Sequence, residues 1–337
     1  MFRCLNFKKT PSLMKLKLSN EMSLKVLGNQ LVMGNVLKYL EVFDIQSLRK
    51  TCHGIRSCVD YLKPDPQIEN YAIHMGTDKS FTAYIEIPGY GNSKAIPYKK
   101  TKDCKNIVSR IFADFEMNLK NQKTCLECLE LLFDDEIGSE PSELLTGFKK
   151  ILMNRTQFLK VKKLHLFSVN GEDVMKILPY LDPKSLEVLE ITNPYYGNPR
   201  VFEPLSVPFD IEEMAKTEQW KFLEELNLKT ANISIPIQNM NLTHFSTIYM
   251  SLAARITSED IAYLKENLLT PKLRRFIICF KEFVEDPQLT DLIGQPRAIS
   301  GNKRIWYFPI PGTNGKMMEI LLNERLRFEN VNYYRYS

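Results

Sequence analysis

The spacing of hydrophobic residues changes after position 66, and this change separates two kinds of predicted structure. Between Leu31 and Pro64 apolar residues recur every three or four positions, as they do on one face of a helix. Breaks in this spacing divide the stretch into three helices of fewer than about twelve residues each, with Asp44 as the expected N-cap of the second. Because helices this short are marginal alone, we expect the three to pack together and to end at Pro64.

Beyond the third helix the apolar residues alternate with polar ones, which is the spacing of a half-buried strand. The clearest strand covers residues 81–87 and ends at the turn signals Pro88 and Gly89. Together with strands at 70–75 and 95–98 it predicts a small antiparallel meander. A connecting helix follows, and the residues of its apolar face are Ile107, Ile111, Phe115 and Leu119.

A six-residue pattern, apolar-x-x-apolar-x-apolar, recurs along the rest of the chain. Helix start signals after Ser139, Asn170 and Thr257 lie between its copies. A strand followed by a helix that leads to a parallel neighbouring strand is the unit of leucine-rich-repeat proteins. Successive copies are 19 to 37 residues apart, which is less regular than the roughly 20 to 29 residues of ordinary leucine-rich repeats. The copies begin at Leu126, Val161, Leu186, Leu223, Leu242 (a weak copy), Leu273 and Ile305.

The predicted fold is therefore α/β. It has three N-terminal helices, a small β-meander, and an irregular, leucine-rich-repeat-like curved α/β solenoid. Alternating residues after Pro311 predict a terminal hairpin that covers the last edge of the sheet. We expect four regions: a loosely ordered leader (1–26), the three helices (27–66), the meander with its connecting helix (67–124), and the repeat region (125–337).

Composition and charge narrow the class of protein. A hydrophobic content of 44% and a charged content of 25% are those of a folded chain. The net charge of +5 is too small to indicate nucleic acid binding, and no apolar run approaches the roughly 18 residues of a membrane span. No acid precedes Glu21, but this basic stretch is rich in Lys rather than in the Arg and Ser of a transit peptide. The seven cysteines, an odd number, do not predict a disulfide framework, so we expect a reducing compartment, the cytoplasm or the nucleus.

Several motifs could carry chemistry, and each has a simpler structural interpretation. Cys125 and Cys128 have the spacing of half a zinc site, but no second pair follows, and buried apolar thiols explain them better. Residues 89–93 lack the motif of a phosphate-binding loop, so we expect a hairpin turn. The acids of residues 134–140 lack EF-hand spacing, so we expect a solvated loop rather than a cation site. No catalytic motif accompanies the histidines, so we expect neither a cofactor nor a metal, and a hydrolase has little support. The histidines are His53, His74, His165 and His244.

Basic pairs recur in the repeat region. If they face the binding side of the array they favour an acidic partner, and otherwise they serve solubility alone. The aromatic residues of the C-terminal stretch 331–337 could form a recognition patch, although packing of the last strand explains them better. The pairs are Lys149-Lys150, Lys162-Lys163 and Arg274-Arg275. As weak candidates for contact with a target we take Lys162, Lys163, Arg274 and Arg275.

The order of apolar positions in the three predicted helices resembles the F-box, a motif that docks on the small adaptor of cullin-RING ubiquitin ligases. The spacing of LVMGNVLKYL followed by DIQSLRKTCHGIR is similar to the nematode type. The family motif usually opens with Leu-Pro, whereas here Gly28 follows Leu27 and constrains the entry to the first helix less. The resemblance implies contacts with the ligase adaptor by Leu27, Leu31, Val32, Val36, Leu37, Leu40, Phe43, Ile45, Leu48, Ile55 and Val59.

In the nematode group the F-box is followed by an FTH domain, a repeat-like region. The segment FLKVKKLHLFSVNGEDVMKILPYLDPKSLEVLEI resembles that domain in its order of strand, helix and proline-containing turn. The resemblance covers nearly everything from Leu27 onward. It implies a non-catalytic substrate adaptor of an SCF-type ubiquitin ligase, with the ligase adaptor and an unidentified protein target as partners.

The alternative comes from another class of protein, a repeat scaffold or inhibitor that binds a protein partner. In it the F-box-like segment would only cap the array, with Val36 and Leu40 packed inside the monomer. Three helices this short leave apolar side chains that they cannot all cover, and an exposed patch of that kind usually marks an interaction site. We therefore favour the adaptor.

Overall fold

The computed structural model describes residues 29–76, 80–88, 93–98, 104–133, 140–167, 170–192, 209–233, 235–252, 255–283 and 287–332. The chain divides into two compact units between Pro66 and Gln67. Leu27, Gly28 and the expected leader lie outside the described residues, as do residues 89–92 and 134–139. Among the helices that are described, none is both long enough and apolar enough to cross a membrane.

Three short helices make up the described part of the N-terminal unit, namely α2 (Gln30–Leu37), α3 (Val42–Arg49) and α4 (His53–Leu62). Asn29 begins α2, because its side-chain oxygen accepts hydrogen bonds from the backbone N–H groups of Leu31 and Val32. The first N–H groups of a helix have no partner within the helix, so such a cap stabilises its start. The side chain of Asn29 thus defines the entry to α2.

The helix boundaries differ in one place from the prediction. The helix α3 already begins at Val42, so the prediction that Asp44 is its N-cap is wrong. Asp44 lies instead in the first turn, where its negative charge interacts favourably with the helix dipole and stabilises the helix. Helix α4 ends at Leu62, its C-cap Lys63 adopts a left-handed conformation with φ of 47°, and Pro64 follows as predicted.

The three helices share a core of their own. An ion pair of 2.7 Å between Arg49 Nε and Asp60 Oδ1 also joins α3 to α4. The side chains buried in this core are Met33, Leu37, Ile45, Ile55, Cys58 and Val59. Partly buried against them are Leu40, Leu48, Cys52 and Leu62. Since no helix could bury these residues alone, their packing together is what makes short helices stable.

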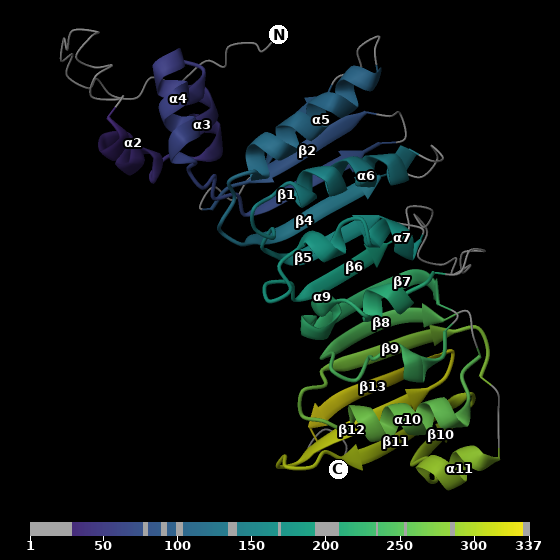
Figure 1. Cartoon of the computed structure of the whole chain (residues 1–337). Helices are drawn as coiled ribbons and strands as arrows, with labels where there is room; N and C mark the ends of the chain where they lie inside the picture. Colours follow the sequence, from purple (N-terminus) through teal and green to yellow (C-terminus); the bar gives the residue numbers. More distant parts are fainter. Residues whose placement is uncertain are drawn as a thin grey trace. The chain divides into compact units, whose positions relative to one another are not determined.

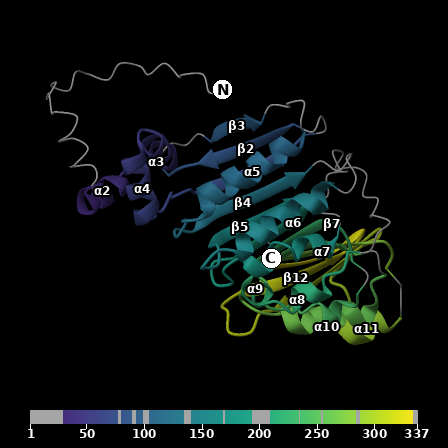
Figure 2. The same cartoon turned by 45° about the horizontal axis from the view of Figure 1, so that its top comes forward.

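The second unit is built on one sheet of 13 strands, and its helices cover one face of that sheet (Figures 1 and 2). Seven neighbouring strands are parallel and follow one another in chain order, namely β1 (Asn70–Met75), β4 (Leu126–Phe133), β5 (Val161–Phe167), β6 (Val188–Thr192), β7 (Glu225–Ile233), β8 (Thr247–Leu252) and β9 (Arg275–Phe280). Antiparallel strands extend both ends, namely β2 (Phe81–Glu86) and β3 (Lys94–Tyr98) beside β1, and β13 (Arg325–Asn332), β12 (Lys316–Leu322), β11 (Lys303–Pro309) and β10 (Ala298–Ser300) beside β9.

Helical segments connect most of the parallel strands. They are α5 (Cys104–Leu119), α6 (Glu140–Met153), α7 (Gly171–Val174), η1 (Leu178–Tyr180), α8 (Glu212–Ala215), α9 (Glu218–Phe222), η2 (Ile237–Asn239) and α10 (Ser258–Leu268), whereas α11 (Gln288–Ile293) follows β9 and leads to the antiparallel strand β10. Two predicted helix starts are confirmed, because the side chains of Asn170 and Thr257 cap α7 and α10. The face of the sheet opposite these helices is called the helix-free face below.

The six-residue pattern supplies the core of this unit. Its fourth and sixth residues point toward the helices, and its fifth residue points to the helix-free face. In β4, for example, Leu129 and Leu131 are fully buried, and they pair in register with Leu164 and Leu166 of β5. The repeated apolar positions therefore form continuous rows across the parallel strands.

Two copies of the pattern were missed or misplaced in the sequence. Strand β1, expected only as part of a meander, also pairs in parallel with β4, and its buried residues Tyr71 and Ile73 lie opposite Leu129 and Leu131. The weak copy predicted to begin at Leu242 begins three residues later in the structure. The copy that forms β8 is Phe245, Ile248 and Met250, all of them buried.

One predicted repeat strand has the wrong neighbours. The copy at Ile305 forms β11, which pairs antiparallel with β10 and β12 and does not continue the parallel array. The hairpin predicted after Pro311 is present as β12 and β13, and β13 covers the edge of β9. The connection between β11 and β12 is too short for a parallel crossover, which requires a dozen or more residues.

Two glycines permit close approaches that a side chain would prevent. A Cβ atom on Gly147 of α6 would lie 2.1 Å from Cζ of Phe112 on α5. A Cβ atom on Gly171, the first residue of α7, would lie 1.9 Å from the backbone oxygen of Asp210. Both glycines therefore set how closely connecting segments pack over the sheet.

Candidate protein-interaction sites

The predicted ligase-adaptor residues fall into two groups in the N-terminal unit. Six of them reach its surface to some extent, and Leu31 is the most accessible at 81% exposed, with Val32 at 38%. The buried ones are Leu37, Ile45, Ile55 and Val59, whereas those that reach the surface are Leu31, Val32, Val36, Leu40, Phe43 and Leu48. Two exposed aromatic residues were not predicted, and these are Tyr39 and Tyr61.

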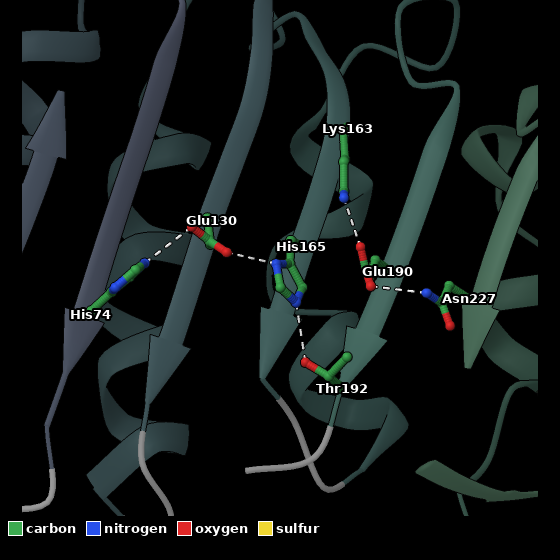
Figure 3. A network of polar contacts seen from close by, with 7 residues as sticks. All are labelled: His74, Glu130, Lys163, His165, Glu190, Thr192 and Asn227. Carbon is green, nitrogen blue, oxygen red and sulfur yellow. Dashed lines mark hydrogen bonds and ion pairs between the residues drawn. The ribbon is translucent and has the colours of Figure 1, made fainter. Parts of the chain in front are cut away.

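Glu130 on β4 lies between two histidines on the helix-free face (Figure 3). Its Oε1 atom is 2.7 Å from Nδ1 of His165 on β5, and its Oε2 atom is 3.0 Å from Nε2 of His74 on β1. Because an ionised carboxylate only accepts hydrogen bonds, both of these imidazole nitrogens must carry a proton. The hydrogen bond from His165, and then that from His74, lowers the pKa of Glu130 from 4.5 to about 2, against the opposing effect of burial.

Thr192 extends this row on β6, where its Oγ1 atom lies 3.1 Å from Nε2 of His165 (Figure 3). A hydroxyl, an imidazole and a carboxylate in this order resemble a nucleophile with its base and orienting group. Such a triad also needs donors for an oxyanion, yet the backbone N–H groups of these strands lie in the plane of the sheet and bond to neighbouring strands. The row therefore suits the fixed presentation of polar groups to a partner better than acyl transfer.

A second row adjoins the first. Glu190 on β6 forms an ion pair of 2.6 Å between its Oε2 atom and Nζ of Lys163 on β5 (Figure 3). Its Oε1 atom accepts a hydrogen bond of 2.8 Å from Nδ2 of Asn227 on β7. The Oδ1 atom of Asn227 is buried and accepts no hydrogen bond from the described residues. These polar groups and the row formed by His74, Glu130, His165 and Thr192 together extend from β1 to β7 on the helix-free face.

The basic residues proposed for target contact are paired with acids. Lys162 lies 3.2 Å from Glu127, and Lys163 is paired with Glu190 as described. Nη2 of Arg274 lies 2.7 Å from Oε1 of Glu225, and Nη2 of Arg275 lies 2.6 Å from Oε1 of Glu329 on β13. Each positive charge is therefore largely balanced within the chain, which weakens its attraction for an acidic partner.

The remaining motifs carry little further chemistry. Cys125 is exposed just before β4, so the expectation that both cysteines are buried is wrong for it. Cys128 is half-buried, and burial raises the pKa of its thiol to about 11, which disfavours the thiolate that binds metals. Over the described part of the chain, no group of three or more His, Cys, Asp or Glu side chains is arranged to hold a metal ion. His53 and His244 lie apart from the Glu130 row, with contacts to Ser57 and to the backbone of Trp220.

Comparison with known proteins supplies the context for these surfaces. The model of the F-box domain matches residues 17–66, and that of the FTH domain matches residues 142–289. A Caenorhabditis elegans protein described as F-box A protein 224 is 22% identical over 294 residues, which cover 83% of this chain and 73% of that protein. No solved structure matches the chain significantly.

The F-box match begins within the stretch expected to be a leader, and it ends at Pro66, where the two compact units divide. The FTH match begins in α6 and runs through β9 into α11, so it covers most of the parallel array. These two domains and their order agree with the resemblance in the sequence. The chain therefore carries an F-box domain followed by an FTH domain, an arrangement consistent with F-box proteins of the nematode type.

Proposed function

We propose that this protein is the substrate-recognition subunit of a cullin-RING, SCF-type ubiquitin ligase. F-box proteins generally act as non-catalytic substrate adaptors of such ligases. Here the F-box would dock on the small ligase adaptor, and the FTH domain would hold a protein target. Ubiquitin transfer would then be accelerated by proximity, because the bound target is kept near the ubiquitin-carrying enzyme at high effective concentration.

Apolar residues on the surface of the N-terminal unit support the proposed docking on the ligase adaptor. Its three helices bury a core of their own, and Leu31 and Val32 still remain exposed in the first turn of α2. The partly buried Val36, Leu40 and Phe43 lie farther along the same segment. Apolar side chains that a folded unit leaves in water are the usual contacts for another chain. We take these surface residues, rather than the buried Leu37, Ile45, Ile55 and Val59, as the direct contacts with the ligase adaptor.

The helix-free face supports the target-binding half. We interpret the parallel strands and their helical connections as an irregular, leucine-rich-repeat-like solenoid, whose strands present one side chain per copy at the fifth position of the pattern. Repeat proteins of this kind bind partners on such extended surfaces. The ordered polar row from His74 to Asn227 would recognise polar groups of the target by hydrogen bonds.

Affinity purification tests the two halves together. Wild-type protein should recover ligase subunits as well as other proteins, whereas the double variant Leu31→Asp, Val32→Asp should lose only the ligase subunits. An acid in the first turn of a helix is tolerated, so this variant should remain folded. The matched control is Phe222→Asp, which changes an exposed apolar residue of α9 in the second unit. Failure of wild-type protein to recover ligase subunits would favour the scaffold or inhibitor instead.

A further inference from the structure

The helix-free face continues past the parallel strands onto β13, where three side chains from neighbouring strands meet. Arg325 of β13 lies opposite Cys279 of β9 in the strand register. The hydroxyl of Tyr249 on β8 is 3.7 Å from the sulfur of Cys279. Arg325 is exposed, so its guanidinium is accessible at the rim of this group.

The positive charge of Arg325 is not balanced like that of its neighbours. Arg275 is paired with Glu329, and Arg327 is paired with both Glu319 and Glu329. Over the residues that the structure covers, Arg325 has an electrostatic contact with Tyr249 and no ion pair with a carboxylate. This contrasts with the pairs at Lys162, Lys163, Arg274 and Arg275, which the sequence had suggested for an acidic partner.

A second cation lies at the same end of the face. Lys303 begins β11, and by the two-residue period of the strand it shares a face with Ile305, which pairs with Leu321 of β12. Lys303 is exposed, and within the described ranges it forms no ion pair. The hairpin turn between β12 and β13 contains Glu324, which likewise makes no ion pair with either cation.

Tyr249 places a neutral hydroxyl beside these charges. Burial raises the pKa of its hydroxyl, and the thiol of Cys279 does the same, while Arg325 acts in the opposite direction. The hydroxyl therefore keeps its proton at neutral pH. It therefore adds no negative charge that would repel an anion approaching the guanidinium of Arg325.

We propose that Arg325, Lys303 and Tyr249 form a binding site for an acidic peptide segment of the target, with Asp or Glu carboxylates as the groups recognised. The proposal rests on the proposed capture of targets by the FTH domain. Arginine binds carboxylates through two parallel N–H donors, and pairs of this kind gain most where no internal acid competes. Charge complementarity of this kind selects among partners more than it raises affinity.

The test uses the full chain and two labelled octapeptides, one of alternating Glu and Gly and the other of alternating Gln and Gly. Fluorescence anisotropy at low salt should show binding of the Glu peptide and much weaker binding of the Gln peptide. The variant Arg325→Gln should weaken the Glu peptide by about three- to fivefold, as for an accessible ion pair. The control Lys216→Gln removes an exposed charge at the C-cap of α8, where Lys216 is already paired with Glu212 and Glu213, and it should leave binding unchanged.

Three results would overturn the proposal. The first is equal weakening of binding by both variants, which would indicate an effect of net charge alone. The second is no binding of the Glu peptide by wild-type protein, and the third is equal binding of the Glu and Gln peptides. Purification of Arg325→Gln separates this proposal from the proposed function, because recovery of ligase subunits depends on the F-box and should not change. If wild-type protein recovers no ligase subunits, the proposed adaptor function is refuted, whereas the result of the peptide measurement is not affected.

Discussion

Replacement of Glu130 by Gln tests whether the polar row on the helix-free face is held as the structure indicates. Gln has nearly the same shape, but it is neutral, and its NH₂ group must face one of the two imidazole N–H groups of His74 and His165. The row would lose one charge-assisted hydrogen bond and weaken the other. The second unit should therefore become less stable.

The pKa of Glu130 gives the size of the effect. Its fall from 4.5 to about 2 corresponds to about 3.4 kcal/mol of stability if no solvent screening is allowed for. The side chain is 26% exposed, so screening reduces this, and we expect a loss of about 1.5 to 2 kcal/mol at pH 5.5.

The dependence on pH follows from the direction of the shift. Because the pKa is lower in the folded state, the stabilisation is fully present above the unfolded value of 4.5 and is lost as the pH falls toward 2. At pH 3 roughly 40% of it should remain. Wild-type protein and Glu130→Gln should thus differ by less than about 1 kcal/mol at that pH.

Urea denaturation followed by tryptophan fluorescence is the appropriate assay. The chain has two tryptophans, Trp220 and Trp306, and both are buried in the unit that contains Glu130. The control Glu127→Gln removes an acid from the same strand whose partner Lys162 is exposed, so its effect should stay within about 0.5 kcal/mol. If Glu130→Gln destabilises the protein no more than this control at pH 5.5, or equally at pH 5.5 and pH 3, then the two hydrogen bonds of Glu130 do not stabilise the fold as described.

Three further substitutions test the packing and the helix cap. Gly171→Ala should destabilise the second unit by about 2 to 3 kcal/mol or more, because the new Cβ meets the backbone of Asp210, and a denaturation midpoint like that of wild type would contradict this. Gly147→Ala should cost less, about 1 to 2 kcal/mol, since the ring of Phe112 can shift, and the same fluorescence assay ranks the two. Asn29→Ala should destabilise the N-terminal unit by about 1 kcal/mol in hydrogen exchange of its amides, whereas the capping variant Asn29→Asp should not.

The sequence predicted the strands of the second unit well because burial leaves a local mark. The fourth and sixth residues of each copy are apolar wherever a strand lies under a helix, so β4, β5, β6, β7 and β9 were located correctly. Strand direction leaves no such mark. The copy at Ile305 looks like the others, and only the short connection after β11 shows that its neighbour must be antiparallel.

The polar row was missed although part of its signal was present. Glu130, His165, Glu190 and Asn227 all occupy the fifth position of their copies, and parallel register brings them side by side. Alignment of the copies would have predicted this row. His74 could not be found in this way, because β1 was read as a meander strand and His74 follows the fifth position of its copy by two residues.

The ion pairs of the basic residues could not be predicted for a different reason. Lys162 and Arg274 were visible in the sequence, but their acidic partners Glu127 and Glu225 lie on other strands, so the neutralisation depends on register. The short N-terminal helices illustrate a similar limit. Their spacing predicted that they pack, but which apolar residues would be buried against one another and which would remain on the surface required the structure.

A calorimetric titration of the purified ligase adaptor into the full-length chain tests the proposed docking most directly. Wild-type protein and Phe222→Asp should each form a saturable complex. The variant Leu31→Asp, Val32→Asp should lose affinity at least tenfold, about 1.4 kcal/mol, with unchanged thermal unfolding of the second unit. Absence of binding by wild-type protein, or equal binding by all three proteins, would contradict the proposed docking.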